Sequence, residues 1–411
     1  MGSFIDCHCH AFNVVDVPMY LTLTDKIKMG TLSRLKIAMG ALLNIADEDL
    51  ASNKIAEHMD FIQFFERSIE RNIEGLLKDI RTYLKASSIM TDDSEILITP
   101  LVMDFDELLI KEAPDQAGKE PSVKEQYRRL KNAIDSSVIQ GIPNARVCPF
   151  IGFDLRKLLR EDDTLNNFKT FWGNNNTLGG NGIRNLESGK LLGIKLYPPI
   201  GFNPGPAPLP TGYEDFYSWC CDNDIPLTVH CQTGSYSVGL DEDEVDGFTT
   251  PENWKRLLEI SDYNSLRINF AHFGGETGTN EMFKLYPLDE DSWTYILIKL
   301  LKKYPNTYAD ISAYDYSKEI HRNNLVKIFE LDDKNEFEGE FKLADKLLWG
   351  SDVPMVVSGK SFKNNGMSSY KNYFQSFVDT IRLSESLSGA KQDVIIKKLT
   401  KENPIKFLRL Q

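Results

Sequence analysis

The amino-acid sequence predicts an α/β fold, a (β/α)8 TIM barrel that forms a single domain over residues 1–411. Eight short apolar segments with the composition of buried strands are spaced along the chain, and helical segments fit between most of them. This alternation is typical of a parallel sheet, and eight repeats of it are typical of a closed barrel. Polar residues, several of them histidines, also fall at the ends of these segments, where barrels of this kind place their active sites.

The first strand is predicted at residues 5–10. Its polar residues alternate with its thiols, so a regular strand would place the two kinds on opposite faces. The polar residues are Asp6, His8 and His10, and the cysteines, which we expect to face the helices, are Cys7 and Cys9. Two imidazoles on one face of a strand can hold a single metal ion.

A long stretch with helical periodicity follows the first strand. Apolar residues recur with a helical spacing between residues 31 and 46 and between residues 62 and 84. We therefore expect a helical insertion over residues 14–93. It would act either as a lid over the site or as a contact in a homo-oligomer, and the sequence leaves this choice open.

Seven further strands follow, each a short apolar run between turn signals or charged segments. They are expected at residues 96–102, 145–153, 193–197, 225–230, 266–272, 307–312 and 346–352. Helical connectors fit between most of them, at residues 123–140, 213–223, 251–261, 292–304 and 370–387. Residues 162–188 are rich in Asn and Gly and predict an irregular loop.

Composition excludes several classes of partner. The net charge of −13 at pH 7 offers no basic surface for a nucleic acid or an anionic membrane. No apolar run is long enough to span a membrane, and no signal-peptide pattern is visible. The six cysteines lack a disulfide-like spacing, which is typical of a reducing compartment. We expect a cytoplasmic protein whose partner is a small-molecule substrate.

Four of the six histidines, and one aspartate, are placed where predicted strands end. His8 and His10 belong to the first strand, His230 and His272 end the fifth and sixth, and Asp352 ends the eighth. Because the carboxyl ends of barrel strands meet at one face, these side chains are expected to converge. Imidazole and carboxylate are ligands of Zn²⁺ in proteins, so the pattern predicts a metal site.

Several motifs resemble the amidohydrolase superfamily. The resemblance is strongest to its amidohydrolase-related branch, which includes aminocarboxymuconate-semialdehyde decarboxylase and pyrone-dicarboxylate lactonase. The motifs are F-I-D-C-H-C-H at residues 4–10, G-I-K-L-Y-P at 193–198, V-H at 229–230, A-H-F-G-G at 271–275 and W-G-S-D-V-P at 349–354. Their order and spacing extend along the whole barrel, but the likeness does not cover the helical insertion.

The resemblance implies a (β/α)8 barrel with one divalent metal, commonly zinc. Its ligands would be His8, His10, His230 and Asp352, and His272 would be an acid/base group beside the metal or an additional ligand. The chemistry of these groups agrees with such roles. Three imidazoles and a carboxylate leave room for a water, Asp352 can accept the proton of that water, and His272 can donate to a leaving group.

Lys195 in the fourth strand allows two interpretations. In binuclear members of the superfamily a lysine on this strand is carboxylated and bridges two metals. In the branch resembled here we favour one metal, with Lys195 holding a substrate carboxylate. Tyr197 has the same strand parity and is expected to line the same pocket.

Three functions remain open from the sequence. The first is a metal-dependent hydrolase that cleaves an amide, lactone or ester bond of a small, carboxylate-bearing substrate through a metal-activated water. The second is a metal-dependent, non-oxidative decarboxylase of a small unsaturated or aromatic acid on the same scaffold. The third is a catalytically silent binding protein, which is disfavoured because every expected ligand position is filled.

Overall fold

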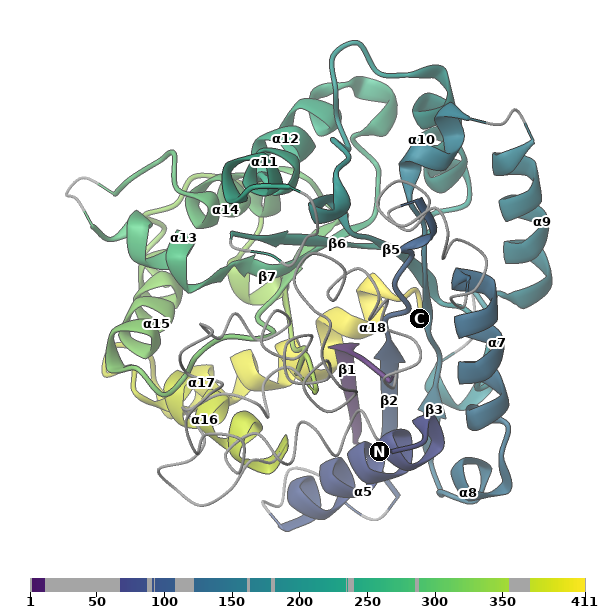
Figure 1. Cartoon of the computed structure of the whole chain (residues 1–411). Coiled ribbons are helices and arrows are strands. Elements are labelled where there is room, and N and C mark those ends of the chain that lie inside the picture. The colour runs from purple at the N-terminus through teal and green to yellow at the C-terminus, as the bar shows by residue number, and fades with distance from the viewer. Residues whose placement is uncertain are drawn as a thin grey trace, which may run out of the picture.

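The computed structural model describes residues 2–11, 67–86, 91, 93–107, 122–160, 163–178, 182–233, 235, 240–284, 288–354 and 370–410. Within these residues, short parallel strands form two sheets with the orders β1-β2-β3 and β4-β5-β6-β7-β8-β9 (Figure 1). The strands are β1 (Ser3–Cys9), β2 (Glu95–Pro100), β3 (Ala145–Val147), β4 (Phe150–Gly152), β5 (Gly193–Leu196), β6 (Leu227–Gln232), β7 (Ile268–Gly274), β8 (Thr307–Asp310) and β9 (Leu347–Leu348).

Backbone hydrogen bonds join the two sheets at both of their edges. On one side, the amide of Val102 donates to the carbonyl of Phe150 at 2.9 Å. On the other, the amide of Cys7 in β1 donates to the carbonyl of Trp349 at 3.0 Å. The strands therefore keep their chain order across both seams. The predicted α/β class with parallel strands is confirmed.

The third predicted strand, at residues 145–153, is two strands in the structure, β3 and β4. Pro149 lies between them and has no amide hydrogen to donate to a neighbouring strand, so the ladder is interrupted there. The other predicted strands are all present with shifted ends. The last is much shorter than predicted, because only Leu347–Leu348 of residues 346–352 form a strand.

Helices surround the strands (Figure 1). The α-helices are α5 (Ile69–Ala86), α7 (Val123–Ile134), α8 (Ser137–Gln140), α9 (Thr164–Asn175), α10 (Thr211–Asp222), α11 (Glu242–Thr249), α12 (Pro251–Glu259), α13 (Gly275–Met282), α14 (Trp293–Lys303), α15 (Glu319–Asp333), α16 (Tyr370–Arg382), α17 (Gly389–Lys397) and α18 (Asn403–Phe407). Short 3-10 turns are η2 (Leu155–Leu159), η3 (Ile183–Asn185), η4 (Pro198–Ile200), η5 (Ser261–Tyr263) and η6 (Leu343–Asp345), and η9 (Lys398–Glu402) is a π-helical turn.

Capping side chains explain where several of these helices begin. The side chain of Ser122 accepts the amide of Glu125 at the start of α7, and Ser292 caps α14 in the same way. α11 begins with a capping box formed by Asp241 and Glu244. Each cap satisfies amide groups that the first turn of a helix leaves without a partner.

The expected helical insertion over residues 14–93 is described only in part. Residues 12–66 lie outside the described residues, so neither the lid nor the contact between copies is tested. The remaining part forms α5, which packs against α7 and α16. Its apolar stripe, including Ile73, Leu77 and Ile80, is buried against them. No helix in the described part of the chain is long and apolar enough to cross a membrane.

The two cysteines of β1 belong to different apolar clusters. Cys9 packs in the large cluster that includes residues of the surrounding helices, whereas Cys7 packs in a smaller cluster with Ile5 and Leu97. Our expectation that both cysteines face the helices is therefore wrong. The pairing of β1 with β2 shifts its register between Asp6 and Cys9, and such a bulge breaks the strict alternation of side chains.

Candidate metal centre

Imidazole and carboxylate side chains gather at the carboxyl ends of the strands. His8 lies in β1 and His10 just beyond it, His230 lies in β6, His272 lies in β7 and Asp352 follows β9. Parallel strands bring their carboxyl ends to one face, so these residues meet although they are far apart in sequence. All of them are buried except His10 and His230, which are partly buried.

Close backbone packing places His8 beside the segment that carries Asp352. The amide of Asp352 donates to the carbonyl of His8 at 2.7 Å. A Cβ atom added to Gly350 would lie 2.6 Å from the Cβ of His8, so a glycine is needed there. Asp6 strengthens the seam, because its Oδ1 accepts the amides of His8 at 3.2 Å and Ser351 at 3.0 Å.

His8, His10 and Asp352 form the tightest group at this face, with one ligand atom from each within 4.8 Å of the others. Nε2 of His10 lies 3.1 Å from Oδ1 of Asp352, and Nε2 of His8 lies 3.3 Å from the same oxygen. The other ring nitrogens are already engaged. Nδ1 of His10 lies 3.2 Å from the carbonyl of Leu101, and Nδ1 of His8 lies 3.0 Å from Oδ2 of Asp310.

This arrangement directs three acceptors at one point. A carbonyl and a carboxylate can only accept, so Nδ1 of His8 and of His10 must carry the proton that they donate. In the neutral rings, Nε2 is then a lone pair, and both lone pairs face a carboxylate oxygen of Asp352. Acceptors attract one another only through a cation between them. The donor set of His8, His10 and Asp352 therefore fits a divalent metal.

The electrostatics of the site also favour a positive charge at this point. Burial alone would lower the pKa of His8, but the carboxylates of Asp310 and Asp352 outweigh it and raise the pKa to about 9. Without an ion, a proton on Nε2 of His8 therefore supplies the positive charge between these acceptors at neutral pH, and a metal would take the place of that proton. Burial lowers the pKa of His10, and Asp352 opposes this only in part. Burial would raise the pKa of Asp352, but His10 and His8 hold it well below its usual value.

His230 and His272 extend the group along the strand ends. Nε2 of His272 lies 3.2 Å from Nδ1 of His230, and the ring of His272 lies 4.8 Å from that of His8. Nε2 of His230 lies 2.6 Å from Oγ of Ser235. Two groups of three potential ligands occur among the described residues: one is His8, His10 and Asp352, and the other is His8, His272 and Asp310. His230 belongs to neither group, and its contact with His272 connects it to His8. Burial lowers the pKa of His272 to about 4, and it also lowers the pKa of His230 well below its usual value.

Asp310 is a buried residue of this site to which our sequence interpretation gave no role. It ends β8, accepts Nδ1 of His8, and forms the second group of potential metal ligands with His8 and His272. One signal could have identified it, because Asp310 is the charged residue that ends an otherwise uncharged strand, as Asp352 ends the next predicted one.

Backbone strain also occurs in this part of the molecule. Non-glycine residues with positive φ include His272 at 67°, Phe273 at 51°, Ala313 at 55° and Asp352 at 55°. Such conformations cost about 1–3 kcal/mol each and persist where surrounding contacts enforce them, often at functional sites. Here they direct His272 and Asp352 toward the other polar groups.

Lys195 and Tyr197 lie where the sequence placed them, on and just after β5. Lys195 is 2% exposed, its register partners are Gly152 and Thr228, and no acceptor among the described residues lies within hydrogen-bond distance of its Nζ. Burial lowers the pKa of Lys195 to about 8, although Asp310 and Asp352 act in the opposite direction. The ring of Tyr197 lies 4.8 Å from that of His230 and 6.3 Å from that of Phe105.

Solved structures resemble the whole chain at low sequence identity. An apo-form IDCase from Metarhizium anisopliae is 13% identical, with a TM-score of 0.51 over 99% of this chain and 97% of that chain. The 5-carboxyvanillate decarboxylase from Sphingomonas paucimobilis is 11% identical, with a TM-score of 0.48 and both chains fully covered. A zinc-bound amidohydrolase from Burkholderia multivorans is 13% identical, with a TM-score of 0.47 and both chains fully covered. At these identities the likeness concerns the fold alone.

Sequence comparison gives a more specific result. No curated protein matches the chain, but the family model described as Amidohydrolase (Amidohydro_2) matches residues 182–410, more than half of it. That range contains His230, His272, Asp310 and Asp352, and it confirms the resemblance read from the motifs. The chain therefore belongs to the amidohydrolase family and is an enzyme of that family.

Proposed function

We propose that this enzyme is a metal-dependent hydrolase that cleaves an amide, lactone or ester bond of a small, carboxylate-bearing substrate. One observation carries the proposal. Nε2 of His8, Nε2 of His10 and Oδ1 of Asp352 are all acceptors and point at one another inside a buried site. A fold rarely directs three acceptors together unless a cation belongs among them.

The proposed metal is a single Zn²⁺, and the proposed ligands are His8, His10, His230 and Asp352. When bound, such an ion supplies Lewis acidity, which polarises a substrate carbonyl and lowers the pKa of water. A second ion bridged by a carboxylated Lys195 is the less favoured alternative. The pKa of Lys195 is lowered to about 8, which means that a fraction of its amine is neutral near pH 8.

The side chains around the ion have separate parts in the proposed reaction. Asp352, which is ionised because its pKa is held low, accepts the proton of the attacking water. His272 is neutral at pH 7, so it can take up a proton and return it to the leaving group. Its contact with His230 also supports a part in positioning that ring.

The substrate is proposed to bind over β5. Protonated Lys195, buried and without a bonded acceptor among the described residues, would receive the substrate carboxylate. An ion pair formed in such a dry place is stronger than one in water. Tyr197 would line the adjacent wall.

A non-oxidative decarboxylase of a small unsaturated or aromatic acid is the second candidate. It is favoured by the aromatic surface that Tyr197 forms with Phe105 and the ring of His230, because planar molecules pack well on such rings. This candidate uses the same residues for the metal and for the substrate carboxylate.

A substrate panel with mass spectrometry tests both candidates. Zinc-loaded protein is incubated with lactones, amides, esters and unsaturated or aromatic acids, beside a chelator-treated sample. A product heavier by one water supports hydrolysis, and a product lighter by one carbon dioxide supports decarboxylation. Equal turnover by the zinc-loaded and chelator-treated samples would refute both.

A further inference from the structure

The carboxylate of Asp310 accepts hydrogen bonds from four residues of the site, His8, Asn269, His272 and Ser312. Its Oδ2 accepts from Nδ1 of His8 at 3.0 Å and from Nδ2 of Asn269 at 2.7 Å. Its Oδ1 accepts the amides of His272 and Ser312, each at 3.1 Å, and also the hydroxyl of Ser312. Asp310 thus contacts two histidines that come from different strands, and Asn269 and Ser312 hold it in place.

The hydrogen bonds of Asp310 determine which nitrogen of His8 carries a proton. An ionised carboxylate only accepts, so Nδ1 of His8 must be the donor to Oδ2 of Asp310. Nε2 of the neutral ring is then a lone pair, and it faces Asp352. A metal ligand needs such a lone pair, and a carboxylate behind the ring is a common way to provide it.

Asp310 acts on His272 through Ser312. The single hydroxyl hydrogen of Ser312 goes to Asp310, so its oxygen can only accept from Nδ1 of His272 at 3.0 Å. The carbonyl of Ser312, 3.3 Å from the same nitrogen, imposes the same direction. Nδ1 of His272 therefore carries the proton, and its Nε2 is an acceptor.

His230 does not follow the same order. The hydroxyl of Ser235 donates to the carbonyl of Gln232 at 2.7 Å, so its oxygen can only accept the proton on Nε2 of His230, 2.6 Å away. In the neutral ring, Nδ1 of His230 is then a lone pair, and it faces Nε2 of His272 at 3.2 Å. Asp310 thus leaves Nε2 as the acceptor in His8 and His272, and its influence ends there.

We infer that Asp310 is a positioning residue that sets the tautomers of His8 and His272, so that their Nε2 atoms are ready to accept a cation or a proton. This inference rests on the proposed metal-dependent function. Asp310 itself would act through the histidines, and neither the family model nor the motifs of the sequence assign it this part. The group formed by His8, His272 and Asp310 leaves one competing explanation, a second cation held by Asp310 itself.

The test is Asp310→Asn, which keeps the size of the side chain but adds two amide hydrogens. A carboxamide N–H facing His8 or Ser312 would reverse or break the chain of donors. Loss of such a supporting contact typically weakens metal binding by about 10- to 100-fold. We therefore expect the Kd for Zn²⁺, measured by competition with a chelator, to rise by about 10- to 100-fold, and the ¹⁵N signals of the neutral His272 ring in the metal-free protein to change tautomer.

Asp332→Asn is the matched control. Asp332 is also buried, at 3% exposure, and accepts Nζ of Lys302 at 2.7 Å and the amide of Leu343 at 2.8 Å. This variant should lose stability but keep the wild-type Kd for Zn²⁺ and the wild-type ring signals. If Asp310→Asn does not fold, Ser312→Ala provides the second test, because it removes the link to His272 and leaves the bond between Asp310 and His8. It also removes Oγ of Ser312 from its place 3.0 Å from Nδ1 of His8, so the ring signals of His272 are the readout.

The outcomes separate this inference from the proposed function. A wild-type protein that binds no Zn²⁺ refutes the metal-dependent function. A wild-type protein that binds Zn²⁺, beside an Asp310→Asn variant with the same Kd and the same tautomers, refutes the inference alone. Two Zn²⁺ ions in the wild type and one in the variant would also overturn it, because Asp310 would then be a ligand. Unchanged signals of His272 in Ser312→Ala would contradict the proposed order of donors.

Discussion

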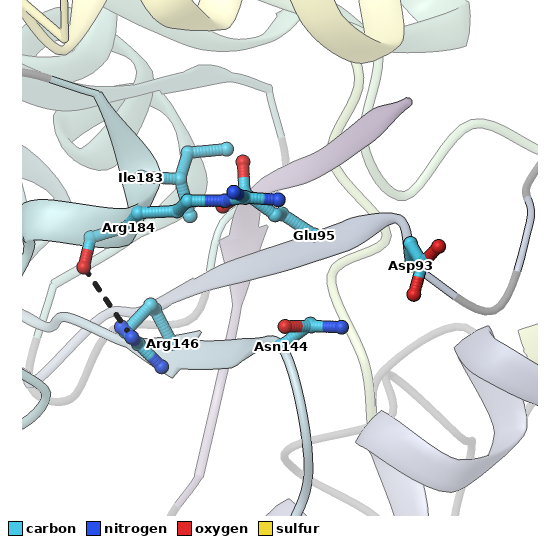
Figure 2. A pocket seen from close by; sticks show the side chains of 6 residues that line it. All are labelled: Asp93, Glu95, Asn144, Arg146, Ile183 and Arg184. Carbon is cyan, nitrogen blue, oxygen red and sulfur yellow. Dashed lines mark hydrogen bonds and ion pairs between the residues drawn. The ribbon is translucent and has the colours of Figure 1, made fainter. Parts of the chain in front are cut away.

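The two ends of the strands carry similar residue types with opposite consequences. At the carboxyl ends, the carboxylates of Asp310 and Asp352 are buried among histidines. At the amino ends, a cavity of about 280 Å³ is lined by Asp93, Glu95, Asn144, Arg146, Ile183 and Arg184 (Figure 2). There, Nε of Arg184 lies 2.5 Å from Oε1 of Glu95, and Arg146 donates to the carbonyl of Arg184 at 3.3 Å.

The difference lies in how donors and acceptors match. At the amino ends each guanidinium finds an acceptor, and the side chain of Arg184 is 54% exposed, so water screens the charges. At the carboxyl ends, the lone pairs of His8 and His10 face the carboxylate of Asp352 away from water. A cluster of charged residues therefore indicates a functional site when its buried acceptors have no matching donors. An additional cation can then satisfy these acceptors.

The largest effect is expected from removing a proposed ligand. His8→Ala and His230→Ala should each lose the bound metal, because each removes one of the four proposed ligands. Elemental analysis of the purified variants measures this. His321→Ala, which removes a buried histidine that belongs to neither group of potential ligands, is the control and should keep its metal. Full metal in both ligand variants would contradict the ligand assignment.

His272→Asn should keep the metal and lose turnover. Asparagine retains a hydrogen-bonding group but cannot take up and return a proton near neutral pH, and general acid–base catalysis typically contributes about 10²- to 10⁴-fold. The measurement is kcat on the best substrate of the panel, with metal content determined on the same sample. If this variant loses its metal together with its activity, His272 is a ligand instead.

Metal removal should lower stability at the carboxyl ends. A ligand present at 100 times its Kd stabilises the folded state by about 2.7 kcal/mol, and chelation removes this contribution. Thermal unfolding with and without a chelator, followed by addition of Zn²⁺, measures the change. Glu95→Gln is the control, because a change at the opposite end of the strands should leave the chelator-dependent shift intact. A melting temperature that the chelator does not change would argue against a resident metal.

Lys195→Met should raise the KM for a carboxylate substrate and leave metal content unchanged. In the wild type, the amine is charged below its pKa of about 8 and neutral above it, so KM should rise as the pH increases through 8. The variant carries no charge at any pH and should lose this dependence. KM measured from pH 6 to 10 tests both statements (a range of about two units on either side of that pKa). A similar rise in KM with pH in the variant would assign the titration to another group.

The smallest effect is expected at the amino ends. Arg184→Ala removes a largely exposed partner of Glu95, and ion pairs of this kind contribute about 0–1 kcal/mol. Chemical denaturation should show a change within that range, with metal content and turnover as in the wild type. A loss of metal or activity in this variant would mean that the two ends of the strands are coupled, which the comparison above does not predict.

Much of the architecture and of the site was predictable because it follows local patterns. The apolar runs located the strands, and the parallel order placed His8, His10, His230, His272 and Asp352 at one face. Lys195 and Tyr197 were also found on the strand that the sequence indicated. These predictions depend only on the period of a strand and on the rule that parallel strands end together.

Only the tertiary structure decided which partners these residues have. Asp310 and His8 are 302 residues apart, and their contact exists because β8 and β1 reach the same end of the sheets. The bulge that separates Cys7 from Cys9 depends on how β1 pairs with β2. In the same way, the interruption of the strand at Pro149 depends on how the neighbouring strands pair. The sequence by itself determined which strands bring histidines to the site, since periodicity is local. The direction of each hydrogen bond was decided by the fold, since it depends on groups that distant strands bring together.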